Sequence, residues 1–546
     1  MASRSPSGLT DDRSIAKSTP QGLALALTTL VVLAVLGAKV YTGHVWEDFL
    51  FTFRNSENLV AGHGLLYQMG ERTHSFTSPL NVLLPALFKA LIPGEGYGAG
   101  LWGFTLVSVG VCGLGLWAYL KFVLGAGDRA SRIEALVVAL CLGLNVRLVV
   151  FSFAGQESGL WAGFLFLAFV ALQRGGELSW RTLGISAAGL MWTRPDCCVH
   201  IVLLVLAAFV FPDRPRAELV RPFVKAAALA AVLYLPWFAW AWWYYGSPVP
   251  QTIFAKMGLY GPVSAGAKLA AFAKAFPDAL GGAFAPIYAD AGGWPAWVMW
   301  FARAAGLVCG AYWLLPTADR VGRFASFVFL GSAAYLALVG VSGVMYPWYF
   351  VPCVVFGVIA LGRIVATSLR SGQMARTVFA YAAMSSMAVG LGYQSVYTLP
   401  QMKLRQTLVE DGVRKPVGLW LRDHQKPSET AMLEPAGYIG YYAGTHILDY
   451  PGLVSPRVVA ARRKMQAGMW GAIVDLQPDW LVLRPNEAKA FMDVPIIGLS
   501  YDLVKIFDVR AEVYRYHDLP GYGFLSSDAC FHIYRRKIHA SAPAAR

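Results

Sequence analysis

Charged residues are scarce in this sequence of 546 residues, and acidic residues are scarcer than basic ones. Asp, Glu, Lys and Arg together make up 14% of the chain, whereas an ordinary soluble domain holds about 25%. Apolar residues make up 56%, and the mean hydropathy is +0.49. This composition excludes a wholly soluble protein and predicts a body embedded in lipid.

Cysteine is also rare, and the seven cysteines show no spacing typical of a metal site. There is no Cys-x-x-Cys pair and no Cys/His arrangement of the kind that binds structural zinc. Cys530 is alone in the last part of the chain, so no disulfide can form within that part. His44, His63 and His74 lie close together in sequence, but their spacing matches no metal motif.

The net charge of +14 does not predict nucleic acid as a partner, because the basic residues form no single patch. They recur in short clusters between apolar runs, as the cytoplasmic loops of a membrane protein do. The first apolar run, 22–40, is too long for a signal-peptide core and lacks a small-residue cleavage site. We therefore expect an uncleaved first helix, with membrane lipid around it.

A transmembrane helix needs about 20 apolar residues. The sequence predicts about eleven such helices, at 21–40, 99–120, 133–150, 158–173, 182–192, 197–211, 226–245, 297–316, 324–343, 350–368 and 377–397. The fifth and sixth form a hairpin, because Arg194-Pro195-Asp196 interrupts their apolar run; proline breaks a helix, and charges are costly in lipid. Counting this hairpin as two crossings puts every basic cluster on one side of the membrane.

This topology predicts three regions in a multi-pass protein of the cell (inner) membrane. A cytoplasmic tail, 1–20, precedes a transmembrane region, 21–397, whose first outer loop, 41–98, is large. An extracytoplasmic domain, 398–546, follows. Its short apolar runs at 430–433, 480–483 and 530–534 are typical of strands, and 454–468 is typical of a helix. The expected fold class is an α-helical polytopic membrane protein with a C-terminal α/β domain.

The first outer loop contains an acidic pair, Glu47-Asp48, directly before an aromatic-rich stretch. Asp48 can cap a short helix that ends near Gly62 and lies along the membrane surface. A carboxylate at that boundary can take a proton from a hydroxyl or hold a divalent cation. The alternative is that Glu47 and Asp48 only cap and solvate the helix end.

Five elements occur in order in this loop. They are Glu47-Asp48, Arg54, Gly62-His63-Gly64, Gly70-Glu71-Arg72 and Thr77-Ser78-Pro79-Leu80. The loop resembles that of GT-C-fold glycosyltransferases that use polyprenyl-phosphate sugars, and looks closest to the group of terminal β-(1→2)-arabinofuranosyltransferases. Further matching segments are Gly155-Gln156-Glu157, Arg194-Pro195-Asp196, 245–256 and 436–453.

The resemblance implies displacement at the anomeric carbon of a polyprenyl-phosphate sugar by a hydroxyl of a glycan or glycolipid acceptor. Asp48 would be the general base, with Glu47 assisting or helping to hold a cation. Candidates to face the departing phosphate are Arg54, Arg194 and Lys256. Candidates to bind the substrate are Glu157, His74 and Asp196. The sugar stays open among pentofuranose, mannose and glucose.

Each candidate also has a structural explanation. Arg54 can pair with Glu57, Arg194 with Asp196, Glu157 can steady Arg147, and Lys256 can extend to the lipid headgroups.

Two other functions are compatible with a many-helix body. A transporter would show paired broken helices around a midplane site, but the sequence shows one such break. A non-catalytic cell-envelope assembly or binding protein would not need Glu47 and Asp48, so substituting them separates it from an enzyme.

Overall fold

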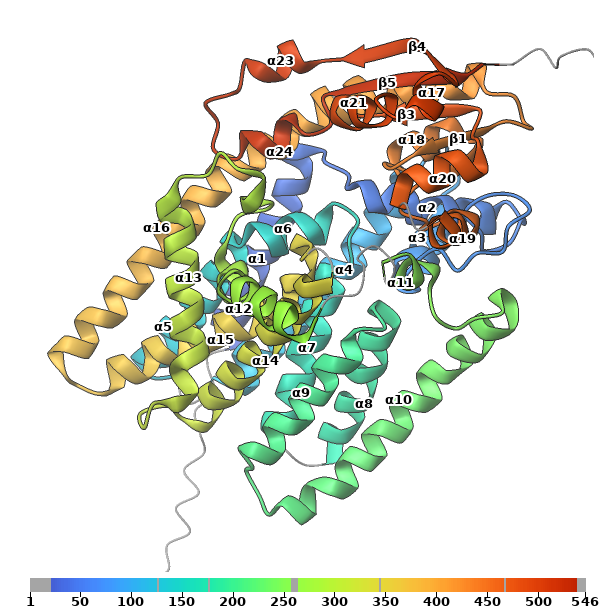
Figure 1. Cartoon of the computed structure of the whole chain (residues 1–546). Helices are drawn as coiled ribbons and strands as arrows, with labels where there is room; N and C mark the ends of the chain where they lie inside the picture. Colours follow the sequence, from blue (N-terminus) through green and yellow to red (C-terminus); the bar gives the residue numbers. More distant parts are fainter. Residues whose placement is uncertain are drawn as a thin grey trace, which may run out of the picture.

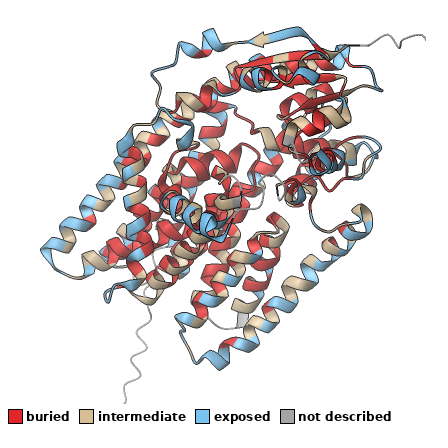
Figure 2. Ribbon diagram, viewed as in Figure 1, coloured by how far each residue is buried: buried red, intermediate tan, exposed pale blue. Residues whose placement is uncertain are grey.

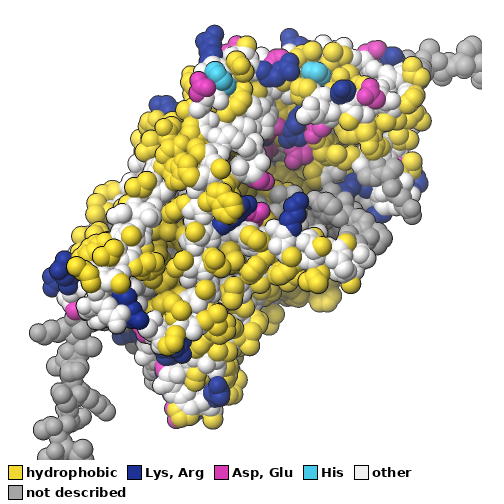
Figure 3. Space-filling view, turned by 60° about the vertical axis from the view of Figure 1, so that its left-hand side comes forward, with side chains coloured by type: hydrophobic (Ala, Val, Ile, Leu, Met, Phe, Trp, Pro, Cys, Tyr) yellow, Lys and Arg dark blue, Asp and Glu magenta, His cyan; other side chains and the backbone are white. Residues whose placement is uncertain are grey.

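The computed structural model describes residues 21–124, 127–174, 177–256, 264–342, 345–465 and 468–537. A body of helices carries a separate domain with a sheet at one end, formed by the last part of the chain (Figure 1). Apolar side chains cover most of the visible surface of the helical body, and charged side chains gather mainly at its two ends and beside the sheet domain (Figure 3). This distribution is the one expected of a protein whose middle lies in lipid.

Five helices are long and apolar enough to cross a membrane. They are α1 (Gln21–Thr42), α4 (Gly98–Phe122), α10 (Arg216–Tyr245), α14 (Arg320–Ser342) and α15 (Val351–Arg370) with the short turn η4 (Pro347–Phe350) before it. Shorter or less apolar helices fill the body: α7 (Ser158–Arg174), α8 (Glu177–Thr193), α9 (Cys197–Val210), α12 (Ala265–Gly281), α13 (Ala296–Ala311) and α16 (Met374–Leu404). The protein is a multi-pass membrane protein, and the number of eleven crossings stays a prediction. α10 lies at one edge of the body and is mostly exposed or half-buried (Figure 2).

The predicted single helix over 133–150 is wrong. α5 (Arg129–Leu144) and α6 (Val146–Phe153) meet at a bend of 58°. Asn145 causes the break, because its side-chain oxygen accepts from the Leu148 amide at 3.0 Å and so caps α6. Its amide nitrogen donates to the Ala283 carbonyl at 2.7 Å. A capping side chain of this kind competes with helix continuation.

The predicted hairpin is present as two helices with a break at Arg194-Pro195-Asp196. α8 ends at Thr193 and α9 begins at Cys197. The Arg194 guanidinium is not left unpaired at this tip, since Glu157 and Asp196 both pair with it.

The first outer loop forms α2 (Glu47–Val60) and α3 (Leu80–Leu91). All eight residues from Phe49 to Ser56 are buried, so this part of α2 is covered by protein, whereas Leu59 and Val60 at its end are exposed. The position of α2 along the membrane surface stays a prediction. The helix packs against α3 and against α18 (Tyr438–Ala443) of the sheet domain. Trp46 holds the capping position and Asp48 makes no cap. The helix is thus part of the contact between the two bodies.

The sheet domain is an α/β layer whose five strands run in the order β2-β1-β3-β5-β4. The strands are β1 (Thr430–Leu433), β2 (His446–Asp449), β3 (Trp480–Leu483), β4 (Tyr501–Asp508) and β5 (Cys530–Arg536), and the helices are α17 (Lys415–His424), α19 (Pro456–Met465), α20 (Gly468–Leu476), α21 (Pro485–Met492), α22 (Pro495–Gly498), α23 (Arg510–Tyr514) and α24 (Tyr522–Ser526). β1 pairs in parallel with β2 and β3, and β5 pairs antiparallel with β3 and β4. The three predicted strands are present, whereas β2 and β4 were not predicted. β4 gives no clear alternation of buried and exposed residues, because it lies at the sheet edge and most of its residues are exposed.

The connection between the two bodies is a continuous helix. α16 runs into a π-helical segment, η5 (Arg405–Arg414), which continues directly into α17. The predicted boundary at 398 therefore falls inside a helix and not in a linker. This continuity fixes the direction in which the sheet domain leaves the membrane body.

Candidate active site

Two cavities meet at Asp48, between the helical body and the sheet domain. The smaller has a volume of about 70 Å³ and the larger about 390 Å³. Both are lined by Asp48, Phe51, Lys256, Trp348 and Leu453. A carboxylate at the place where two cavities join can contact one ligand in each cavity.

Asp48 lies in the first turn of α2 and is partly buried. One of its carboxylate oxygens accepts a hydrogen bond from the Gln156 amide at 3.1 Å. Burial raises the pKa of Asp48 above its usual value, while the charge of Lys256 and the bond from Gln156 pull the pKa down. A raised pKa makes the carboxylate a stronger base while it stays ionised.

Glu47 is the neighbour of Asp48, but its carboxylate is held by the sheet domain. It accepts from the Gly437 amide at 2.6 Å, from the Tyr438 amide at 3.2 Å and from Arg414 at 2.8 Å. Burial raises the pKa of Glu47 to about 7, against the opposing effect of Arg414. The acidic pair is therefore divided between two tasks, because Glu47 fastens the sheet domain to the start of α2.

Lys256 ends the short helix α11 (Gln251–Lys256) and lines both cavities. Its ammonium group donates to the Tyr349 hydroxyl at 2.9 Å and lies over the Tyr346 ring, 5.2 Å from the centroid. Within the described ranges, no carboxylate lies within 4.0 Å of this nitrogen. The positive charge of Lys256 is thus available to an anionic ligand.

Arg194 and Glu157 form the far wall of the smaller cavity. Arg194 donates to Glu157 at 2.7 Å and to Asp196 at 2.9 Å, and Asn81 donates to the other Glu157 oxygen at 3.4 Å. Arg147 does not pair with Glu157; it donates to the carbonyls of Ala285 and Pro286. Asp196 does not line either cavity, but it pairs with Arg194, which lines the smaller one.

Arg54 and His74 do not line either cavity, which does not fit the roles predicted for them. The Arg54 guanidinium donates to the carbonyls of Gly440 and Thr445 and lies 4.6 Å from the Tyr67 ring centroid. These contacts join α2 to the sheet domain, and the role of Arg54 at a phosphate stays a prediction. The His74 ring stacks on Tyr245 with centroids 4.7 Å apart.

The larger cavity has an aromatic wall and a charged wall, and the sequence did not predict the charged wall. Trp46, Tyr288, Tyr346, Trp348 and Phe524 supply the rings, and Arg405, Glu410, Arg414, Glu434, Arg484 and Asp528 supply the charges. The charged residues lie in the chain after position 400 and reach the site only because the sheet domain packs over it. Gln156 was part of the Gly-Gln-Glu segment that carried the resemblance, but nothing in the sequence predicted its bond to Asp48.

The residues that the structure describes contain no group of three or more His, Cys, Asp or Glu side chains that could hold a metal ion. Where the two cavities meet, the Asp48 carboxylate lies beside the Lys256 ammonium group, which has no carboxylate within 4.0 Å in the described ranges, and beside hydrogen-bonding side chains. This set is suited to proton transfer beside a departing anion.

Comparison with known proteins identifies the fold. Residues 401–534 match a family described as a domain of unknown function (DUF8728). No curated protein matches the sequence. The structure is similar to that of ArnT from Cupriavidus metallidurans bound to undecaprenyl phosphate, with a TM-score of 0.52 and 11% identity over 96% of this chain and 99% of ArnT. The fold is of the GT-C type.

A second similar structure is the oligosaccharyltransferase of Archaeoglobus fulgidus in the apo form, with a TM-score of 0.49 and 13% identity over 84% of this chain and 69% of the other. The similarity to ArnT extends over 96% of this chain and therefore includes both the helical body and the sheet domain. Neither of these two structures is that of an arabinofuranosyltransferase.

Proposed function

We propose that this protein is a membrane glycosyltransferase. It moves a sugar from a polyprenyl-phosphate donor to a hydroxyl of a cell-envelope glycan or glycolipid on the outer face of the cell membrane. The observation that carries the proposal is the position of Asp48 at the meeting point of two cavities, with Lys256 lining both. The GT-C fold and the undecaprenyl phosphate bound to ArnT support the class of donor.

The reaction needs a base for the acceptor hydroxyl and a positive charge beside the departing phosphate. Asp48 takes the proton from the acceptor hydroxyl, and that oxygen forms a bond to the anomeric carbon of the donor sugar. The bond from the anomeric carbon to the phosphate oxygen breaks, and its electron pair leaves with the polyprenyl phosphate. Lys256 stabilises the negative charge that develops on the phosphate, because its own charge has no carboxylate partner in the described part of the chain.

The two cavities receive the two substrates. The donor sugar occupies the smaller cavity, where Asn81, Gln156 and Glu157 offer hydrogen bonds to its hydroxyls. The acceptor enters the larger cavity, whose aromatic wall suits the apolar face of a sugar ring. Arg194 keeps the Glu157 carboxylate in place. The positive charge of Arg194 is divided between two acidic partners, Glu157 and Asp196. The terminal arabinofuranosyltransferases are the group that the first outer loop resembles, so pentofuranose is the first sugar to test.

The break between α5 and α6 is a feature that a transporter would also have. Asn145 does not line either of the two cavities, and its side chain is used in capping α6 and binding Ala283. The break therefore positions α6 beside the site rather than forming a substrate path.

The test is transfer by membranes that contain the wild type or Asp48→Asn. The membranes are given labelled polyprenyl-phosphate arabinofuranose, mannose and glucose. We expect Asp48→Asn to lower transfer by about 10²- to 10⁴-fold, which is the usual contribution of a positioned base. The matched control is Asp278→Asn, which removes a carboxylate from a surface pair with Arg303. Normal transfer by Asp48→Asn would exclude Asp48 as the base, and no transfer from any donor by the wild type would contradict the proposal.

A further inference from the structure

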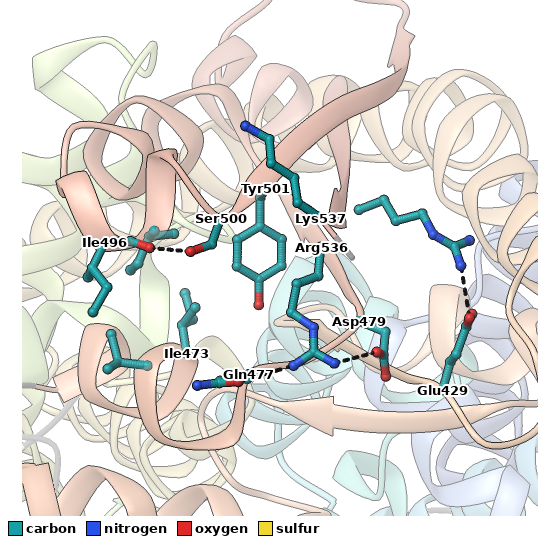
Figure 4. Close-up of a pocket in the computed structure, with 12 residues that line it drawn as sticks. Glu429, Ile473, Gln477, Asp479, Ile496, Ser500, Tyr501, Arg536 and Lys537 are labelled. Atoms are coloured by element: carbon teal, nitrogen blue, oxygen red, sulfur yellow. Dashed lines mark hydrogen bonds and ion pairs between the residues drawn. The ribbon is translucent and has the colours of Figure 1, made fainter. Parts of the chain in front are cut away.

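A third cavity lies inside the sheet domain and shares no residue with the two that meet at Asp48. Its volume is about 410 Å³, and it opens between α20, α22 and the ends of β4 and β5 (Figure 4). The mechanism proposed above uses none of its side chains.

The cavity combines an apolar floor with a polar rim. Its apolar lining residues, called the floor, are Ile473, Val474, Ile496, Ile497 and Tyr501, and its polar lining residues, called the rim, are Glu429, Gln477, Asp479, Ser500, Arg535, Arg536 and Lys537. The Tyr501 ring stands between the two sides of the cavity, with its hydroxyl turned toward the chain before β3 (Figure 4). A ligand that fits this cavity has an apolar face and several hydrogen-bonding groups around its edge.

Each of the three cations on the rim is paired with a carboxylate, two of them on the rim and one, Asp502, outside it. Arg535 pairs with Glu429 at 2.9 Å, Arg536 with Asp479 at 3.0 Å, and Lys537 with Asp502 at 3.3 Å. An anionic ligand would have to displace three carboxylates that already hold these cations. A neutral ligand can instead use the paired groups as they are, because a carboxylate accepts from a hydroxyl while a guanidinium donates to one.

The backbone of Gln477, a residue of the rim, is in an unfavourable conformation. Its φ of 45° lies in the left-handed region, which costs a residue other than glycine of order 1 kcal/mol or more. Glycine would remove this cost, yet a glutamine stands here with its side chain on the rim (Figure 4). Its side-chain oxygen accepts from Arg536 at 3.3 Å.

We propose that this cavity binds neutral sugar residues of a saccharide chain, at a second site separate from the active site. A sugar ring provides one apolar face and hydroxyls at its edge, which match the floor and the rim. The inference rests on the proposed function, since it makes the acceptor a polymer that contacts the protein at two places. A long acceptor is then held by both sites, and the second site raises its effective concentration at Asp48.

The test uses the full chain in detergent micelles and isothermal titration with defined saccharides. The probes are neutral hexasaccharides of arabinose, mannose or glucose, and a sulfated hexasaccharide as the anionic probe. We expect at least one neutral probe to bind and the sulfated probe to bind more weakly. Gln477→Gly removes the rim side chain while allowing the left-handed φ. It should therefore weaken binding by about fivefold or more without lowering the Tm.

The control is Arg510→Gln, which breaks an exposed pair with Asp508 outside the cavity and should bind as the wild type does. Binding of the sulfated probe in preference, no binding of any neutral probe at millimolar concentration, or unchanged binding by Gln477→Gly would each overturn the proposal.

Asp48→Asn separates this inference from the proposed function. That variant should bind the neutral probe normally, while its transfer is about 10²- to 10⁴-fold lower than that of the wild type. The second site predicts that the wild type transfers sugar to a long acceptor better than to a short one. If Gln477→Gly loses this preference but still transfers sugar to a short acceptor, the second site is supported. Normal transfer without any saccharide binding in the titration overturns the second site alone, and saccharide binding without transfer counts against the proposed function alone.

Discussion

Glu47 and Arg414 form an ion pair of 2.8 Å across 367 positions of sequence. Arg414 also pairs with Glu410 and Asp528, so one guanidinium joins the first outer loop, the connecting helix and the sheet domain. The residue directly after Glu47 is the proposed base. The position of Asp48 therefore depends on how the sheet domain is seated.

Replacing Arg414 by Met should destabilise the protein by about 3–5 kcal/mol, because it removes the cation that the buried Glu410 and Asp528 share with the half-buried Glu47. The measurement is thermal unfolding of the full chain in detergent. Arg422→Gln is the matched control, since Arg422 forms an exposed pair with Asp423, and it should change stability by less than about 1 kcal/mol. Equal stability of the two variants would contradict the role of Arg414 as a junction.

Gly437→Ala should loosen the sheet domain from α2. A Cβ atom at Gly437 would come within 2.6 Å of the Glu47 carboxylate and closer still to its backbone carbonyl, so the contact has to open. We expect faster proteolysis between the two bodies and lower transfer, with donor affinity less affected. Gly392→Ala in α16 meets no atom within 4 Å and should match the wild type. A Gly437→Ala protein as resistant to protease as the wild type would show that the domain is held elsewhere.

Lys256→Gln should lower kcat/KM for the donor by about 10²-fold, since removal of a group that stabilises developing charge has effects of this size. Lys256→Arg keeps the positive charge and should recover part of the activity. The measurement is the rate of transfer at a series of donor concentrations. If both variants lose the same activity, the charge of Lys256 is not what the reaction uses.

The pH dependence of transfer should show a limb on the acid side. The base has to be ionised, so the rate rises with pH through the pKa of Asp48, and burial places that pKa above the usual 3.8. Glu47, whose pKa is about 7, is removed as a titrating group in Glu47→Gln. This variant should keep an acid limb, moved to lower pH because a neighbouring negative charge is lost. A pH-independent rate in Glu47→Gln would identify Glu47 as the base.

The orientation of the sheet domain can be tested with an impermeant thiol reagent on intact cells. Cys530 is buried and is unsuitable as a probe, whereas the Asp518 side chain is 93% exposed. Asp518→Cys should be labelled on intact cells if the domain is extracytoplasmic, and the unsubstituted protein serves as the background. Labelling of Asp518→Cys only after the cells are opened would invert the topology.

Several features of the fold follow from local chemistry and were predictable for that reason. Long apolar runs became helices, Arg194-Pro195-Asp196 ended one helix before the next began, and the apolar runs at 430–433 and 480–483 became strands. The break at Asn145 was missed because a single capping side chain interrupts an otherwise apolar run. β4 was missed because an exposed edge strand gives no clear pattern of burial.

The sequence by itself determined that this is a multi-pass membrane protein with an α/β domain at its end, because hydropathy and periodicity depend only on neighbouring residues. The sequence also predicted Asp48, Lys256 and Arg194 as candidate site residues. Only the tertiary structure decided that the Glu47 carboxylate and the Arg54 guanidinium bind groups of the sheet domain, with Glu47 also lining the larger cavity. Their partners, Arg414, Gly437 and Gly440, lie more than 350 positions away, and no local pattern in the chain records which distant groups a side chain will meet after packing.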